Sequence, residues 1–526
     1  MRCCVGLHPH AGQDAPPAFG AFEAQRRLLE TTSALPPRDW YRDSAGPTAG
    51  KPPLCAIVAS AFGTLARSLV PDFVAGPEAV GYDGEDARAF MRVSVLLCDV
   101  VLFFSATWFF CILFYRSNLE VNLKGSPDEL KDTAARFVLY STRASTAPRT
   151  GSSARARRQR NSGSEFNSTS LSVPVALVSE VFLIILLQPA IVLVDHGHFG
   201  YSVIPLGLVL WTLVFCLEDH PAVATAVFSL ALSYDWTVVC FSPVVAIYLV
   251  RNALHRKGGA GPASVVTAGL RAARLSCIAA SIILGLWLPF SQSIVELVAH
   301  LQAMRNAAHP IKVWPAVLGL VPCCYDLTRR PTRGPLRPRR LVWATFNCSL
   351  TFALFSRDPA SALLPLLPAA LLAGEVPGPS CWFSVAAAFN LLPLLVQDHL
   401  MLPAIVCVGV FVATNAICFR GELCFLPLPW VEGRAQVHST QDDQGIRHGI
   451  RMIDSSVFLR LASGLLAALS MLALAVPSLG HVWLLLQVVL VRTFFVVAWL
   501  YGLWYQWMLP DEDTPSVSAA KKDKAA

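Results

Sequence analysis

The densest group of chemically capable side chains in this sequence is the segment Val194-Asp195-His196-Gly197-His198-Phe199-Gly200-Tyr201. One carboxylate, two imidazoles and a phenol supply acceptors, donors and an aromatic face within one short turn. Such a turn is able to hold an anionic lipid phosphate or a sugar hydroxyl. An alternative is a capped interfacial turn, with Asp195 bonded to the following backbone and Tyr201 among interfacial aromatics. A metal site of His196 and His198 is less favoured, because no third ligand is near in sequence.

Two smaller groups lie elsewhere in the chain. Between Pro16 and Tyr41, the run Phe19-Gly20-Ala21-Phe22-Glu23-Ala24-Gln25-Arg26-Arg27 precedes several leucines and the pair Trp40-Tyr41. This mixture predicts an amphipathic helix lying in a membrane interface, with a solvated surface helix as the alternative. The third group is Ser356-Arg357-Asp358-Pro359, where a lone Arg-Asp pair between apolar blocks is typical of capping or snorkelling.

The elements that must position these groups are strongly apolar. Of 526 residues, 54% are hydrophobic and 15% are charged, against about 25% charged in soluble domains. A helix needs about 20 mostly apolar residues to cross a hydrocarbon core of about 30 Å. The clear predicted spans are Arg92–Tyr115, Leu171–Val194, Ser202–Leu217, Ser276–Phe290, Leu341–Phe355, Met401–Phe419, Ser455–Val476 and His481–Met508. The sequence therefore predicts an all-α integral membrane protein and excludes a soluble enzyme.

Shorter apolar blocks fill the middle of the chain. They lie at about 221–234, 236–250, 313–325, 362–373 and 381–396. If each of them crosses the membrane, the chain has about 13 spans. Proline removes a helical hydrogen bond, so Pro221, Pro243, Pro315 and Pro365 predict broken or kinked helices here.

Lysine and arginine clusters set the predicted orientation, because such residues accumulate in cytosolic loops. They fall in 116–170, 251–274, 329–340 and the C-terminal tail, and alternation through 13 crossings places all four on one side. The predicted organisation is a luminal loop with interfacial helices (1–90), a first span (91–115), a basic disordered cytosolic loop (116–170), a main bundle (171–419), a cytosolic loop (420–454), a helix pair (455–508) and a cytosolic tail (509–526). The net charge of +7 is thereby assigned to topology, and no nucleic-acid partner is predicted.

The 15 cysteines are scattered, mostly inside apolar blocks. They form no CxxC or Cys/His spacing of the kind that binds zinc. We interpret them as small apolar packing residues.

Several segments carry a resemblance to a known family. The first-loop residues Phe19-Gly20, Phe22-Glu23-Ala24-Gln25-Arg26, Leu35-Pro36 and Trp40-Tyr41 are similar to the first luminal loop of the endoplasmic-reticulum dolichyl-phosphate-glucose α-1,3-glucosyltransferases. The segment from Asp195 to Tyr201 resembles that family's Asp-His-Gly-His-Phe-Gln-Tyr-Asn signature. Phe90-Met91-Arg92, Leu97-Cys98-Asp99 and Leu288-Pro289-Phe290 match in order. The details favour the branch that adds the first glucose to lipid-linked Man9GlcNAc2.

The resemblance implies a GT-C fold in the endoplasmic-reticulum membrane, with a long first luminal loop over the active site. It implies dolichyl-phosphate-glucose as donor, a dolichyl-diphosphate oligosaccharide as acceptor and transfer with inversion. A luminal carboxylate would act as general base, the charge of the departing dolichyl phosphate would need stabilisation, and no metal or cofactor is expected. The substrate-binding residues it suggests are Gln25, Arg26, Lys51, Asp195, His196, His198, Tyr201 and Arg357.

The sequence also departs from the family's pattern. The family's base is the Asp of a Gly-Asp-(Tyr/Phe)-Glu motif, and that position is Ala21, which cannot accept a proton. Glu23 is the nearest surviving carboxylate, but two helical positions turn it roughly 200° away, so it is a weak substitute. Lys51 stands in a segment where the family has a second acid, and Arg357 aligns with its His-Glu-Lys turn. The family's first helix, which would precede Val5 and bring the count to about 14, is absent from the sequence.

Three hypotheses follow from this combination. The chain is a glucosyltransferase that acts through another base, or a non-catalytic relative that binds dolichyl lipids or partners. The third is a truncated reading frame, favoured by the missing helix.

Overall fold

The computed structural model is helical throughout the part of the chain that it describes, and it contains no strand there. The described residues are 1–8, 12–13, 20–43, 46–82, 84–124, 175–255, 262–290, 302, 313–329, 338–356, 358–419 and 480–509. The predicted cytosolic loop at 420–454, the predicted span Ser455–Val476, the tail after Leu509 and Arg357 lie outside this set, as does nearly all of the 116–170 loop.

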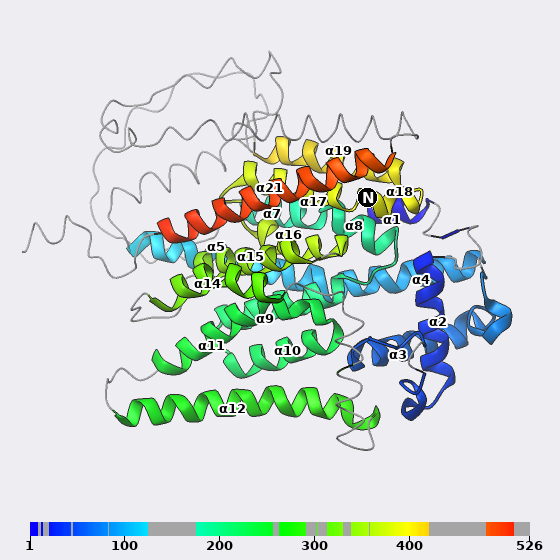
Figure 1. Ribbon diagram of the computed structural model, residues 1–526, viewed down its shortest axis with the longest axis horizontal. Coiled ribbons are helices and arrows are strands. Elements are labelled where there is room, and N and C mark those ends of the chain that lie inside the picture. The colour runs from blue at the N-terminus through cyan, green and yellow to red at the C-terminus, as the bar shows by residue number, and fades with distance from the viewer. Residues whose placement is uncertain are drawn as a thin grey trace, which may run out of the picture.

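The N-terminal region forms short helices at one end of the molecule (Figure 1). They are α1 (Arg2–Gly6), α2 (Gly20–Ala34), η1 (Pro37–Asp39), α3 (Pro53–Leu69), η2 (Pro71–Val74) and η3 (Gly76–Ala79). α3 begins at Pro53, where the absent N–H costs nothing because first-turn N–H groups have no intrahelical partner. α2 and α3 pack closely on each other. The helix expected between Pro16 and Tyr41 is present as α2, and it packs on α3, while its place in a membrane interface stays a prediction.

The first long helix is continuous through a π-helical turn. It comprises α4 (Glu85–Cys98), the turn η4 (Asp99–Phe104) and α5 (Ser105–Lys124). Its apolar part, Glu85–Arg116, is long enough to cross a membrane and contains the predicted first span. π-turns occur often at functional sites because they shift side chains out of register, and this one begins at the buried Asp99.

The remaining helices form the main bundle. Its first part comprises α7 (Val175–Leu186), α8 (Pro189–His196), α9 (Val203–Leu217), α10 (Pro221–Tyr234), η5 (Trp236–Phe241), α11 (Ser242–His255), α12 (Pro262–Trp287) and η6 (Leu288–Phe290). Its second part comprises α14 (Val313–Arg329), α15 (Pro338–Phe355), η7 (Pro359–Ala362), α16 (Leu363–Leu371), α17 (Pro377–Asn390), α18 (Leu392–Gln397), α19 (Met401–Cys418) and α21 (Gly480–Met508). Figure 1 shows α12 along one outer side, with α19 and α21 along the opposite side.

Four of the described helices are long and apolar enough to cross a membrane, and the bent pair α7 and α8 would make a fifth. This result does not test the predicted total of about 13 crossings. Among the described residues, the predicted blocks at 202–217, 221–234 and 236–250 form apolar helices of 10–17 residues. Such helices are shorter than a straight crossing requires. The structure thus establishes a multi-span helical protein, and the larger count stays a prediction.

Prolines lie at the starts of the short α-helices, and the kinks expected around them stay a prediction. Pro221 is the first residue of α10, and Pro243, Pro315 and Pro365 lie in the first turns of α11, α14 and α16. A proline in the first turn removes an N–H that the helix does not use. These prolines therefore mark the starts of helices.

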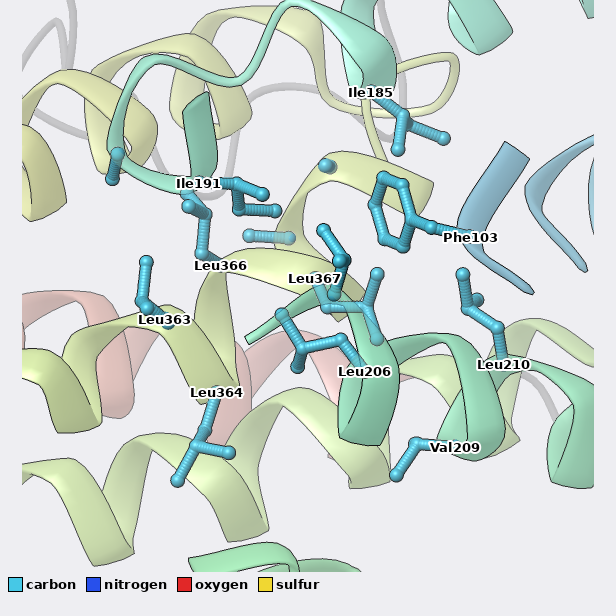
Figure 2. Close-up of a cluster of buried hydrophobic side chains, with 14 of the residues drawn as sticks. Phe103, Ile185, Ile191, Leu206, Val209, Leu210, Leu363, Leu364, Leu366 and Leu367 are labelled. Carbon is cyan, nitrogen blue, oxygen red and sulfur yellow. The ribbon is translucent and has the colours of Figure 1, made fainter. Parts of the chain in front are cut away.

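The core of the bundle lies where α9, α16 and the π-turn meet the bent pair α7 and α8. Figure 2 shows its aliphatic side chains around Phe103, and all the labelled ones are buried: Phe103, Ile185, Ile191, Leu206, Val209, Leu210, Leu363, Leu364, Leu366 and Leu367. By contrast, outer helices leave large apolar side chains uncovered, with Leu270 66% and Leu288 74% exposed. Apolar surface on this scale is rare on soluble monomers and is normal where lipid is the solvent.

Candidate functional site

The turn between α8 and α9 is held by Asp195. Its buried carboxylate accepts hydrogen bonds from the backbone N–H of Ser202 at 2.7 Å and of Val203 at 3.0 Å. These N–H groups belong to the start of α9 and have no intrahelical partner, so Asp195 caps that helix. Of the alternatives for Asp195, the structure thus shows the capping role.

The same turn contains two strained residues. Phe199 and Tyr201 have φ values of 58° and 50°, a left-handed conformation that costs energy for side chains of this size. Strain of this kind clusters at ligand sites because the surrounding contacts hold it in place. Tyr201 is buried, and its hydroxyl shares a 2.6 Å hydrogen bond with the hydroxyl of Ser94 on α4. Tyr201 therefore lies inside the protein, and the alternative that placed it in an interfacial belt was wrong.

His196 belongs to a buried charged network. Its Nε2 lies 2.6 Å from Oδ2 of Asp99, and the Arg2 guanidinium donates to both oxygens of Asp99 at 2.9 Å. Arg2 also donates to the carbonyl of Leu186 at 3.1 Å. The network joins α1, the π-turn and α8. Nothing in the sequence pattern pointed to Arg2, because its partners are remote along the chain.

His198 forms a second pair at the same end of the bundle. Its Nδ1 lies 2.5 Å from Oδ2 of Asp398, in the connection between α18 and α19. Leu400, in the same connection as Asp398, lies close to Gly197: a Cβ on Gly197 would be 2.7 Å from the Leu400 side chain. The absence of a side chain at Gly197 therefore leaves room for this connection beside the turn. The sequence analysis missed Asp398. The signal that could have found it is an ionisable residue between two apolar blocks.

Helix α2 docks on the α8–α9 turn through aromatic rings. Phe22 contacts Phe199 edge to face, with 5.3 Å between ring centroids, and Phe73 at 5.8 Å. Ala21 and His198 are the residues next to the two rings that touch. The structure thus brings Phe22, the residue after the predicted base position, to the Asp195–Tyr201 segment.

Glu23 and Arg26 form the inner charged layer of α2. Glu23 is 2% exposed, and its carboxylate accepts from Arg26 at 2.7 and 2.9 Å and from Arg27 at 2.9 Å. Burial acts to raise its pKa, but the hydrogen bonds from Arg26 and Arg27 and the charge of Arg26 outweigh it, so the pKa of Glu23 is lowered. Arg26 is fully buried and also bonds Glu30 and the carbonyl of Phe73. The structure does not bring Arg26 to an open surface, and its contact with substrate stays a prediction.

A second docking contact joins the first loop to α12. Trp40 stacks on Phe290 with ring centroids 5.3 Å apart, and Tyr41 contacts both Phe290 and Trp287 at 5.4 Å. The segments Trp40-Tyr41 and Leu288-Pro289-Phe290, two parts of the family resemblance, therefore touch. Lys51 is exposed beside them, and its carbonyl accepts from the Tyr41 hydroxyl at 3.1 Å.

The other predicted site residues are less closely involved. Gln25 is half-buried on α2, and Arg357 lies outside the described residues. Within the described ranges, no three His, Cys, Asp or Glu side chains gather as a metal site requires. The cysteines within the described ranges are free thiols, and eight of them are buried among the helices: Cys98, Cys111, Cys216, Cys240, Cys323, Cys348, Cys381 and Cys407.

The apolar bundle is that of a multi-span helical membrane protein. Its candidate site is formed by the polar groups gathered at one end of the bundle. The sequence model of the ALG6, ALG8 glycosyltransferase family matches residues 1–140, 175–305 and 291–501. The chain belongs to this glycosyltransferase family, which confirms the resemblance.

Relatives with assigned names extend the match along most of the chain. It is 26% identical over 456 residues to the rat dolichyl pyrophosphate Man9GlcNAc2 alpha-1,3-glucosyltransferase, covering 80% of this chain and 77% of that protein. The mouse protein of the same name is 27% identical over 451 residues, with 78% and 75% covered. The protein of that name from Saccharomyces cerevisiae is 26% identical over 436 residues, with 76% and 70% covered.

Proposed function

We propose that this chain is an α-1,3-glucosyltransferase that adds glucose to lipid-linked Man9GlcNAc2 in the assembly of the N-glycan precursor. The carrying observation is the docking of α2 on the Asp195–Tyr201 turn through Phe22 and Phe199. This contact sets the first loop over the polar end of the bundle, where a lipid-linked sugar would be bound. The names of the relatives supply the acceptor, a dolichyl pyrophosphate oligosaccharide.

The donor in this proposal is dolichyl-phosphate-glucose, and the product forms with inversion at the anomeric carbon. Lys51 is an exposed cation beside the aromatic contact of Trp40 and Phe290. We assign Lys51, Gln25 and Arg357 to binding of the phosphate or of sugar hydroxyls, since guanidinium, ammonium and amide groups suit these ligands. Membrane lipids surround the exposed apolar faces of the outer helices.

The proposal includes a GT-C-type bundle of about 13 spans in the endoplasmic-reticulum membrane, with residues 1–90 luminal and the tail cytosolic. Two groups of contacts support this orientation. Predicted luminal segments meet at one end, where His198 pairs with Asp398 and η1 with η6. Predicted cytosolic segments meet elsewhere, where Arg339 bonds Glu375 at 2.7 Å and Arg340 bonds the carbonyl of Leu509 at 3.0 Å.

A second candidate is a non-catalytic relative that binds dolichyl lipids or partners. The observation that favours it is Ala21, which stands half-buried at the family's base position and has no proton-accepting group. The two candidates differ in one measurable outcome, the transfer of glucose.

The test is expression of the full chain in cells that lack the first-glucose enzyme, followed by chromatography of the lipid-linked oligosaccharides. Glucosylated Man9GlcNAc2 is the expected product, and the rat relative serves as the positive control. A stably inserted chain that yields none of it overturns the proposed function and favours the non-catalytic relative.

A further inference from the structure

Glucose transfer to a sugar hydroxyl needs a group that takes the hydroxyl proton as the new bond forms. Ala21 offers none. If the proposed function holds, another side chain near the junction of Phe22 and Phe199 must accept the proton. For each described titratable group around this junction, the question is whether its existing hydrogen bonds leave a lone pair that can accept a proton.

Two of these groups, Asp195 and Glu23, already accept hydrogen bonds from buried partners. Both oxygens of Asp195 accept backbone N–H groups in a fully buried position. Glu23 is bonded to Arg26 and Arg27, and its lowered pKa makes it a poor proton acceptor. Each would have to break a buried hydrogen bond before it could act.

His196 is committed as well. Its Nε2 faces Asp99, and the pair is completed by Arg2 in a position closed to solvent. An imidazole bonded in this way holds α1 and α8 together. Its Nε2 is therefore not free to accept the proton of an incoming hydroxyl.

His198 differs from these groups in exposure and in bonding. The side chains of His198 and Asp398 are 25% and 10% exposed, so the pair reaches the surface of the site. An ionised carboxylate only accepts hydrogen bonds, so Nδ1 carries the proton that it donates to Asp398. The lone pair of the neutral ring is then on Nε2, which accepts no hydrogen bond from the described part of the chain. A carboxylate behind an imidazole fixes its tautomer and stabilises the cation that forms after proton uptake.

We infer that His198, oriented by Asp398, is the general base that replaces the missing carboxylate at Ala21. This inference rests on the proposed function. His198 is the residue next to Phe199, and Phe199 touches the residue next to Ala21. His198 and Ala21 are thus each one residue along the chain from the two rings in contact.

The step balances as follows. Nε2 of His198 takes the proton of the acceptor hydroxyl while the hydroxyl oxygen forms a bond to the anomeric carbon of glucose. The bond between that carbon and the phosphate oxygen breaks, and its electron pair leaves with dolichyl phosphate. The imidazolium, paired with Asp398, later releases its proton to solvent, and nothing is oxidised or reduced.

The test uses the purified full chain with dolichyl-phosphate-glucose and lipid-linked Man9GlcNAc2. His198→Gln is expected to lower kcat by about 10²–10⁴-fold, the contribution of a positioned base, with KM little changed. His220→Gln is the matched control, because His220 is exposed in the connection between α9 and α10 and belongs to no part of this site. His198→Ala should regain transfer when free imidazole is added, which a merely structural histidine would not show.

Asp398 is a positioning residue in this scheme. Asp398→Ala should lower kcat with KM maintained, and Asp398→Glu should restore part of it. As a second, independent route, Ala21→Asp in the His198→Gln background should regain transfer, because it returns a carboxylate to the family's position. Either recovery also demonstrates that the variant is folded.

The outcomes separate the two proposals. A wild-type chain that transfers glucose while His198→Gln keeps its full kcat overturns the base assignment and leaves the proposed function standing. Loss of activity that imidazole does not restore in His198→Ala and that Ala21→Asp does not restore in His198→Gln also overturns it, and assigns His198 to structure. A wild-type chain that transfers nothing overturns the proposed function, and the base assignment with it.

Discussion

At the scale of single residues, the carboxylates of Glu23 and Asp398 show how partners decide what an acid can do. The Glu23 carboxylate is buried and accepts hydrogen bonds from the guanidinium groups of Arg26 and Arg27 on the same helix. Asp398 instead has one imidazole partner and is partly exposed. In the first arrangement, the charge of Glu23 serves to hold α2 in place. The second leaves the far nitrogen of the imidazole available for proton transfer.

Replacing Glu23 tests this structural role through pH. Because the folded-state pKa is lowered, the ionised carboxylate stabilises the protein fully above its ordinary pKa of about 4.3 and progressively less as pH falls through the lowered value. Glu23→Gln should lose about 3 kcal/mol at pH 7, as expected when one partner of a buried ion pair is removed. Thermal unfolding in detergent should show this difference from wild type shrinking on acidification below about pH 5.

The control for Glu23 is Asp39→Asn, which removes the pair of half-buried Asp39 and exposed Arg42. Exposed pairs contribute about 0–1 kcal/mol, so this variant should stay close to wild type. An equal loss for Glu23→Gln at every pH would contradict the linkage. Glu23→Gln should also keep its kcat below its melting temperature, since His198 and not Glu23 takes the proton.

At the same scale, sequence reasoning found one side of each pair. The residue types and close spacing in Asp195–Tyr201 marked His196 and His198. Their partners Arg2, Asp99 and Asp398 lie 97 to 200 residues away in the chain, so no local pattern connected them. Long-range polar pairs depend on packing, which periodicity does not encode.

At the scale of elements, the site depends on how closely α2 approaches α3. A Cβ built on Gly63 of α3 would lie 2.3 Å from the carbonyl oxygen of Leu29 on α2. The two backbones therefore nearly touch, and this contact helps hold Phe22 against Phe199. A glycine in the interior of a helix is otherwise unfavourable by about 1 kcal/mol relative to alanine.

Gly63→Ala should therefore separate the two helices. We expect a loss of about 1–3 kcal/mol in stability, typical of overpacking, together with reduced glucose transfer as Phe22 moves. Gly269→Ala on α12 is the matched control, because nothing lies within 4 Å of its Cβ position, and it should stabilise slightly. Thermal unfolding of both variants checks the prediction. Equal stability for the two would refute the close contact.

Elements were predictable where the apolar run was long and less so where it was short. The span beginning near Arg92 and the helix at Met401 follow from continuous hydropathy. Among the shorter blocks, the one at 221–234 coincides with α10, whereas the one at 381–396 covers parts of two helices, α17 and α18. The docking of α2 and of Trp40 could not be predicted, since an amphipathic helix fits a membrane interface and a protein surface equally well.

At the scale of the whole molecule, the contacts separate into a polar end beneath the first loop and a basic end around Arg339. Basic loops remain in the cytosol. This asymmetry, together with the placement of the remaining arginine clusters in the sequence, supports the orientation proposed above.

Glycosylation tags test this orientation directly. A tag inserted after Arg42, an exposed position in the first loop, should be modified in microsomes, whereas a tag within residues 143–160 should stay unmodified. Mobility shifts before and after removal of glycans provide the measurement. Modification of the second tag alone would show that the protein has the opposite orientation. The His198 site would then face the cytosol, where a luminal reaction cannot take place.

The pairing of His198 with Asp398 also has a consequence for biogenesis. The two residues are 200 positions apart, and ribosomes add about 5–20 residues per second. His198 therefore waits about 10–40 s after its own synthesis before its partner exists. The pair of His198 and Asp398 forms only after α18 has been synthesised, so the proposed site is among the last parts of the described bundle to be completed.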